Sequence, residues 1–178
     1  MSHYFRQLSE ESETALRTAL GKNVGLLFPE AWLDVTREGA VVSSVSISLG
    51  HRSYLIIENE WADTPIGFMD YYSFSASLSD RPKDIRVTED TGPGWLHHHV
   101  STIHTWSPTI IDKITVYETS DSFEEEAIRY DSAILFDYEA GQILLTPDRS
   151  ITGYIAINYK PNVIIEIIAT MKYRKEIQ

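Results

Sequence analysis

Apolar residues occupy every second position in two stretches of this chain, and this period of two constrains the fold more than any other feature. In residues 44–49 and again in residues 72–78, the residues between the apolar positions are serines. Side chains of a β-strand point alternately to its two faces, so each stretch predicts a strand with one buried face. The serines are expected to face solvent.

Further strands are predicted from β-branched and aromatic residues between turn signals. These lie at 52–60, 84–88, 113–118, 132–138, 142–146 and 153–159. The strongest local signal is the Glu139-Ala140-Gly141 turn between two of them, which predicts a hairpin. The strand that follows extends the hairpin to a C-terminal three-strand meander.

The remaining regular structure is expected to be helical, near each end of the chain. Ser9 is a plausible N-cap, because acidic residues follow it directly. An apolar stripe of helical spacing comes next and Gly21 ends it, which indicates a short N-terminal helix. From Asn162 the apolar residues keep helical spacing, and the basic residues up to Lys175 favour a C-terminal helix. The predicted fold class is α+β: one domain over residues 1–178, with a mostly antiparallel sheet and two helices packed on it.

Composition indicates the cellular compartment of the protein. The chain is 43% hydrophobic and has no cysteine, which fits a folded domain in a reducing compartment and predicts a cytoplasmic location. The most apolar segment, residues 163–169, contains a glutamate and is shorter than the roughly 20 residues that a membrane-spanning helix needs. No apolar run of signal-peptide length follows the first residues, so secretion and membrane insertion are not expected.

Charge favours a basic partner and excludes nucleic acid. The net charge is −11, and residues 118–139 hold eight acids against Arg129 alone. Such a surface repels phosphate backbones and attracts cations. The partner-binding residues predicted from this stretch are Glu124, Glu125, Glu126, Tyr130 and Asp131.

Four of the six histidines fall within residues 97–104. In an extended segment His97 and His99 share a face, and with His104 they are the candidate ligands of a divalent metal such as Zn, Fe or Ni. His51, Glu89 and Asp90 are other candidates for the third ligand. The alternative is that the histidines, with two tryptophans, form a hydrogen-bonded rim at one end of the sheet, and this alternative is preferred because partial motifs often mislead. No cofactor is therefore assigned.

The glycine followed by His-x-His resembles half of the first cupin motif. A cupin also needs a histidine in a second, downstream motif, and none follows His104. The resemblance therefore does not carry a cupin fold or activity to this chain.

Three function classes follow. The first is a non-catalytic protein whose acidic face binds a basic protein; in size, charge and lack of catalytic motifs the chain resembles small acidic bacterial immunity proteins, which neutralise toxins. The second is a metal-dependent enzyme or metal-binding domain built on the histidines. The third is a small-ligand carrier with a pocket lined by aromatic residues. Those residues are Trp32, Trp61, Tyr72 and Trp95.

Overall fold

The structure is a computed structural model that describes most of the chain. The described residues are 2–29, 33–35, 39–67, 69–83, 87–89, 95–97, 103–148 and 153–178. At 33–34, 87–89, 95–97 and 103–109, and at several positions of 25–29, the description covers the backbone only.

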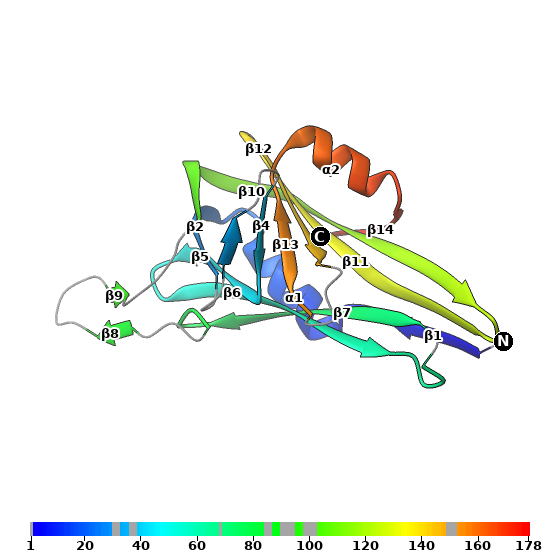
Figure 1. The fold of residues 1–178 in the computed structure, drawn as a ribbon. Coiled ribbons are helices and arrows are strands. Elements are labelled where there is room, and N and C mark those ends of the chain that lie inside the picture. The colour runs from blue at the N-terminus through cyan, green and yellow to red at the C-terminus, as the bar shows by residue number, and fades with distance from the viewer. Residues whose placement is uncertain are drawn as a thin grey trace.

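Within these residues the chain forms fourteen strands and two helices (Figure 1). In chain order they are β1 (Ser2–Arg6), α1 (Glu10–Ala19), β2 (Asn23–Pro29), β3 (Leu33–Val35), β4 (Gly39–Val42), β5 (Ser44–Gly50), β6 (Ser53–Asp63), β7 (Asp70–Ser79), β8 (Val87–Glu89), β9 (Trp95–His97), β10 (Ile103–Phe123), β11 (Glu126–Tyr138), β12 (Gly141–Pro147), β13 (Ile155–Asn158), α2 (Pro161–Ile168) and β14 (Lys172–Ile177).

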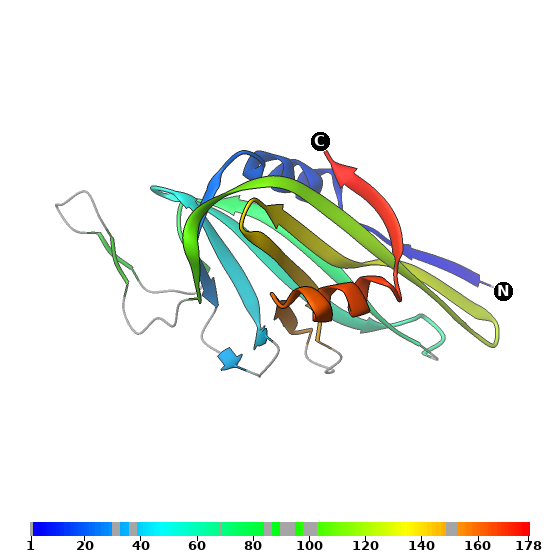
Figure 2. The same cartoon turned by 90° about the horizontal axis from the view of Figure 1, so that it is seen from above.

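One curled sheet contains most of these strands (Figures 1 and 2). Its order is β3-β4-β13-β12-β11-β10-β2-β5-β6-β7, with β1 paired to β11 and β14 paired to β10. The pairing of β1 with β11 is parallel, and the other described pairs are antiparallel. The curl brings β7 back toward β11, where the rings of Tyr72 and Tyr130 lie 6.2 Å apart. A separate ribbon pairs β8 with β9.

The main core lies inside the curl. Side chains from ten strands of the sheet and from the buried face of α1 meet there, including Leu16, Leu55, Ile134 and Leu145 at 0% exposure. Burial of each such side chain contributes about 1.5–3 kcal/mol. A smaller cluster lies on the outer face, where Ile164 of α2 packs against β11 and β12.

The predicted α+β class is wrong, because the protein is mostly antiparallel β. The two described helices have only 10 and 8 residues, whereas β10 and β11 have 21 and 13. Strands β11, β12 and β13 do not form a separate C-terminal unit, since β10 and β4 continue the sheet on either side of them. Among the described residues, no helix combines the length and apolarity that a membrane crossing requires.

The predicted C-terminal helix is also partly wrong. Helix α2 stops at Ile168, and the hydroxyl of Thr170 donates to the carbonyl of Ile167 at 2.8 Å just beyond it. The basic residues expected at the end of a helix belong instead to β14, which pairs with the middle of β10. Pairing with β10 gives these backbone groups ladder hydrogen bonds that local helical spacing cannot foresee.

Predictions that rest on neighbouring residues are confirmed more often than those that depend on contacts between distant parts of the chain. Ser9 caps α1, accepting a hydrogen bond from the backbone N–H of Ser12 at 3.1 Å. The hairpin between β11 and β12 turns where it was predicted to turn. The solvent-facing serines of β5 are a wrong prediction: Ser44 and Ser46 are 2% and 1% exposed. The segment after β7 lies against Ser46, whose hydroxyl accepts a hydrogen bond from the N–H of Lys83 at 2.9 Å.

Candidate functional site: an acidic tip

The long hairpin of β10 and β11 ends in a turn made only of glutamates. Phe123 and Glu126 are the last pair of the ladder, so Glu124 and Glu125 form a two-residue turn, and both are exposed. Glu124 has a φ of 51°, in the left-handed region. A residue with a Cβ adopts this region at a cost of roughly 1–2 kcal/mol, and hairpin turns usually place Gly or Asn there. The chain thus carries a carboxylate where glycine would make a more stable turn.

The buried carboxylate of Glu126 joins this turn to the turn between β6 and β7. Its side chain is 0% exposed and accepts hydrogen bonds from the hydroxyl of Thr64 and, at 3.0 Å, from the backbone N–H of Ile66. The N–H of Ser2 donates to the carbonyl of Glu125 at 2.6 Å, which adds the start of β1. Two hairpins and the first strand therefore meet at one end of the molecule, close to the N-terminus (Figure 1).

Five exposed carboxylates gather at this end, which we call the acidic tip. They belong to Asp63, Asp70, Asp121, Glu124 and Glu125. The described residues that surround it, 2–4, 62–67, 69–71 and 121–128, include no lysine or arginine. Asp63 and Asp70 are paired across β6 and β7; a hydrogen bond between their side chains, with some burial and the charge of Asp70, raises the pKa of Asp63. Negative charge is thus concentrated enough to favour binding of a proton or a cation.

Exposed apolar side chains lie among these carboxylates. Ile66 is 49% exposed and Phe123 is 52% exposed. The guanidinium groups of Arg6 and Arg129 border the tip and lie over aromatic rings, that of Tyr71 at 5.1 Å and that of Phe5 at 5.6 Å. Apolar anchors with a polar rim are the usual composition of a protein-binding surface.

The structure separates the predicted partner residues. Glu124 and Glu125 are in the tip, whereas Glu126 and Asp131 are 0% and 1% exposed and do not form part of the exposed acidic surface. Tyr130 lies next to Tyr72, outside the tip. The prediction from sequence missed Asp63 and Asp70, although two aspartates flanking the Thr64-Pro65 turn were a usable signal of charge at a hairpin end.

Asp131 is a buried carboxylate that contacts residues from other parts of the chain. It accepts a hydrogen bond from the backbone N–H of Leu8 at 2.7 Å, and the Nε of Arg174 lies 2.6 Å from its other oxygen. Arg174 and Lys175 also donate to Glu13 of α1, at 2.9 and 2.7 Å. Burial raises the pKa of Asp131, and the Leu8 N–H and Arg174 only partly oppose this effect. These charges join α1, β11 and β14, which is a structural role.

The predicted metal site lies largely outside the described part of the chain. His99 is not among the described residues, and His97 and His104 are described by their backbone alone. Among the side chains that the structure does describe, no three His, Asp or Glu residues are grouped to hold a metal ion. His51 is exposed in the turn after β5. The histidine hypothesis therefore stays a prediction.

The predicted aromatic pocket is placed only in part. Trp61 and Tyr72 are opposite each other on β6 and β7. Trp32 lies outside the described residues, and Trp95 is described by its backbone alone, as the pair of Glu89 in the β8–β9 ribbon. Tyr72 does line a cleft, together with residues that the sequence did not suggest.

Comparison with known proteins adds no relative: no protein-family model, curated protein or solved structure matches this chain.

Proposed function

We propose that the protein is a non-catalytic binding protein whose acidic tip engages a basic segment of a protein partner. The observation that carries this proposal is Glu124, held at a φ of 51° in a two-residue turn. Glycine would relieve the backbone strain at this position. The chain has a glutamate there instead, and its carboxylate lies beside the four others of the tip. Strained residues cluster at functional positions, so stability is given up here for charge.

The tip suits a basic partner in shape and in chemistry. The carboxylates supply attraction that accelerates encounter, and the exposed Ile66 and Phe123 supply apolar area for a stable contact. The hydrogen bonds of Glu126 fix the two turns relative to each other, so the charges are organised before a partner arrives.

An inhibitor of a basic protein, of the kind found among acidic immunity proteins, is the most concrete form of this function. The support is the bulk resemblance in size and charge, together with a tip that can cover a cationic surface. We place the protein in the cytoplasm, a location supported by the absence of cysteine.

The test uses a defined cationic probe, a ten-lysine peptide, titrated into the full chain and followed by amide chemical shifts. The largest shifts are expected at residues 63–70 and 121–126, with affinity falling steeply between low and physiological salt as the Debye length shortens to about 8 Å. The tip variant carries Asp121→Asn, Glu124→Gln and Glu125→Gln and should lose about tenfold in affinity, roughly 0.5 kcal/mol for each exposed charge.

A matched control removes the same number of charges along or just beyond the strands that form the tip, at positions away from it. It carries Asp80→Asn, Asp112→Asn and Glu139→Gln, all exposed in the structure. The control should bind the peptide much as the parent protein does. Equal losses in the two variants would refute the proposal, because the peptide would then be sensing net charge alone.

Strain at the turn gives a second discriminating variant. Glu124→Gly should stabilise the protein by roughly 1 kcal/mol, since glycine adopts positive φ without steric cost, and should also weaken peptide binding. Arg52 has a φ of 50° in the turn between β5 and β6, away from the tip. Arg52→Gly removes the same backbone strain, offset by the loss of the interaction that Arg52 makes, and should leave peptide binding unchanged.

A further inference from the structure

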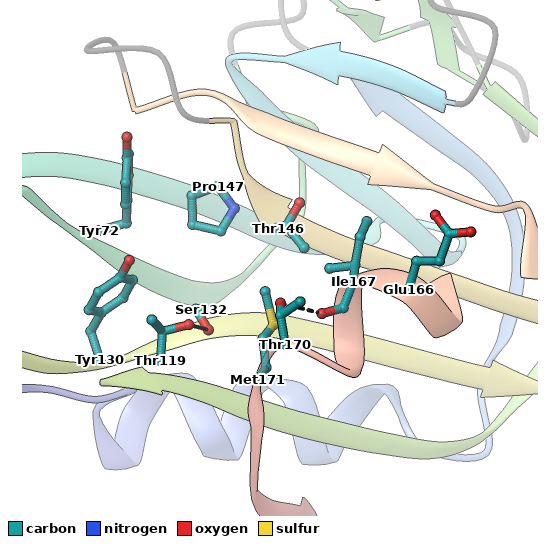
Figure 3. A pocket seen from close by; sticks show the side chains of 10 residues that line it. All are labelled: Tyr72, Thr119, Tyr130, Ser132, Thr146, Pro147, Glu166, Ile167, Thr170 and Met171. Carbon is teal, nitrogen blue, oxygen red and sulfur yellow. Dashed lines mark hydrogen bonds between the residues drawn. The ribbon is translucent and has the colours of Figure 1, made fainter. Parts of the chain in front are cut away.

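A cleft of about 420 Å³ opens between the end of α2 and the place where β7 approaches β11. Its walls come from β7, β10, β11, β12, α2 and the residues just after α2, so it exists only when all of these elements are packed together. Figure 3 shows the two tyrosines at one end and Ile167 and Glu166 at the other, with the hydroxyl side chains and Met171 between them. This size is within the range of about 300–1,000 Å³ that small-molecule sites usually have.

A β-bulge shapes the floor of the cleft. Tyr117 pairs with Ala133 and the next residue, Glu118, pairs with Asp131, so Ser132 is an extra residue in β11. Bulges re-aim side chains and are common beside functional sites. Here the bulge brings the hydroxyl of Ser132 to 2.7 Å from that of Thr119, which donates to it.

Hydroxyl groups from three neighbouring strands therefore lie together. Ser132 and Thr146 are 3% and 7% exposed, and each accepts a hydrogen bond, from Thr119 at 2.7 Å and from Asn158 at 3.4 Å. Within the described part of the chain, the hydrogen bond between Thr119 and Ser132 uses one of the two hydroxyl protons of that pair, and the hydroxyl of Thr146 has no acceptor. A buried donor normally has an acceptor, so both hydroxyls are suited to a ligand oxygen in the cleft.

The other walls are apolar or aromatic. Tyr72 and Tyr130 have rings 6.2 Å apart, tilted by 51°, and Ile167 and Met171 line the side formed by α2. Tilted rings offer a flat apolar surface for one face of a ligand but do not form the facing walls of a cage for a quaternary ammonium group.

Charge limits the class of ligand further. Among the described residues, no lysine or arginine lines the cleft, and the one carboxylate that does, on Glu166, is exposed. An anionic ligand would find no counter-charge on these lining residues and would be repelled by a protein of net charge −11. Neutral molecules that carry several oxygens and one apolar face match both the hydroxyl groups and the apolar side chains of the cleft.

We propose that this cleft binds a neutral polyhydroxylated molecule of the monosaccharide class, with Ser132 and Thr146 donating to ligand oxygens and Tyr130 against its apolar face. The site uses none of the carboxylates of the acidic tip. It is therefore independent of the proposed partner binding, and either can fail without the other.

The test titrates glucose, galactose and N-acetylglucosamine separately into the full chain, each to about 10 mM, with amide chemical shifts as the readout. At least one sugar should shift the amides of Thr119, Ser132 and Thr146 in a saturable way. Ser132→Ala and Thr146→Val should each weaken that sugar about tenfold, which is the usual effect of one lost hydrogen bond. Thr146→Val keeps the shape of the side chain and guards against a folding defect in Ser132→Ala.

Ser122→Ala and Thr18→Val remove hydroxyls outside the cleft and should leave sugar binding unchanged. Tetramethylammonium chloride serves as a probe for a cation site in the same cleft. The proposal is overturned if no sugar shifts the cleft amides, if tetramethylammonium saturates the cleft and the sugars do not, or if the control variants weaken the sugar as much as the cleft variants do.

Discussion

Replacing Glu126 tests whether one buried carboxylate organises the acidic tip. Glu126→Ala removes the acceptor of two hydrogen bonds and leaves the hydroxyl of Thr64 and the N–H of Ile66 without it. A hydrogen bond to a charged group contributes about 1.5–3 kcal/mol, so the two together contribute about 3–6 kcal/mol. Burying a carboxylate is itself unfavourable, so its removal offsets part of this loss. We expect the free energy of unfolding to fall by about 3 kcal/mol.

Urea denaturation followed by tyrosine and tryptophan fluorescence measures this loss, and the melting temperature should fall by about 6–12 °C for a chain of this size. Glu126→Gln keeps one carbonyl oxygen as an acceptor and should lose about half as much. Glu125→Ala, at the exposed neighbouring position, should change stability by less than about 0.5 kcal/mol. A loss below about 1 kcal/mol for Glu126→Ala would refute the reasoning, because the two turns would then not depend on this side chain.

Three further outcomes are expected. Gly39→Ala should lower stability by about 3 kcal/mol in thermal unfolding, since a Cβ would lie 2.1 Å from a carbonyl oxygen of β13. In an NMR titration the carboxyl of Asp131 should titrate at a higher pH than an ordinary aspartate, and that of Glu13 at a lower pH than an ordinary glutamate. Burial raises the pKa of Asp131; burial also acts to raise that of Glu13, but hydrogen bonds and charges from β14 outweigh it and lower the pKa. Ionised Asp131 therefore lowers stability at neutral pH, and this penalty disappears as the pH falls through its raised pKa. Glu13 has the opposite effect: it stabilises the fold above its usual pKa, and this stabilisation is lost as the pH falls through its lowered pKa. If the histidines form a metal site, the untagged protein should take up about one equivalent of Zn, Fe or Ni by elemental analysis, and His97→Ala or His99→Ala should abolish the uptake.

The elements that sequence located were those with local causes. A serine cap, an alternation of period two and a glycine turn each act within a few residues, and α1, β5 and the β11–β12 hairpin follow from them. The 21 residues of β10 were harder to recognise, because Ser107-Pro108 suggests a break. The strand runs through that point where the pairing of β10 with β2 is irregular, between His104 and Thr109, and proline is tolerated at such irregularities.

The candidate site shows the same limit. Glu124, Glu125 and Glu126 are equivalent in the sequence, and the count of acids was enough to predict an acidic surface. Which of the three is buried depends on Thr64 and Ile66, about sixty positions earlier in the chain. The cleft was not predicted for the same reason, since its lining comes from five separate elements and its floor from a bulge that no local pattern indicates.

Strands β1 and β14 are far apart in the sequence, yet both pair with the β10–β11 hairpin, and this has a consequence for folding during synthesis. The first residue of the ladder, Ser2, pairs with Glu126, and the last, Ile177, pairs with Ile114 and is 2% exposed. During translation β1 therefore emerges long before its partner strand, and the side of β10 that pairs with β14 stays open until β14 has been made. Contacts of such long sequence separation slow folding, so β1 and the open side of β10 are exposed strand edges in every nascent chain. Chaperone dependence and aggregation during expression should accordingly respond to substitutions in β1 and β14 more than to equally exposed positions elsewhere.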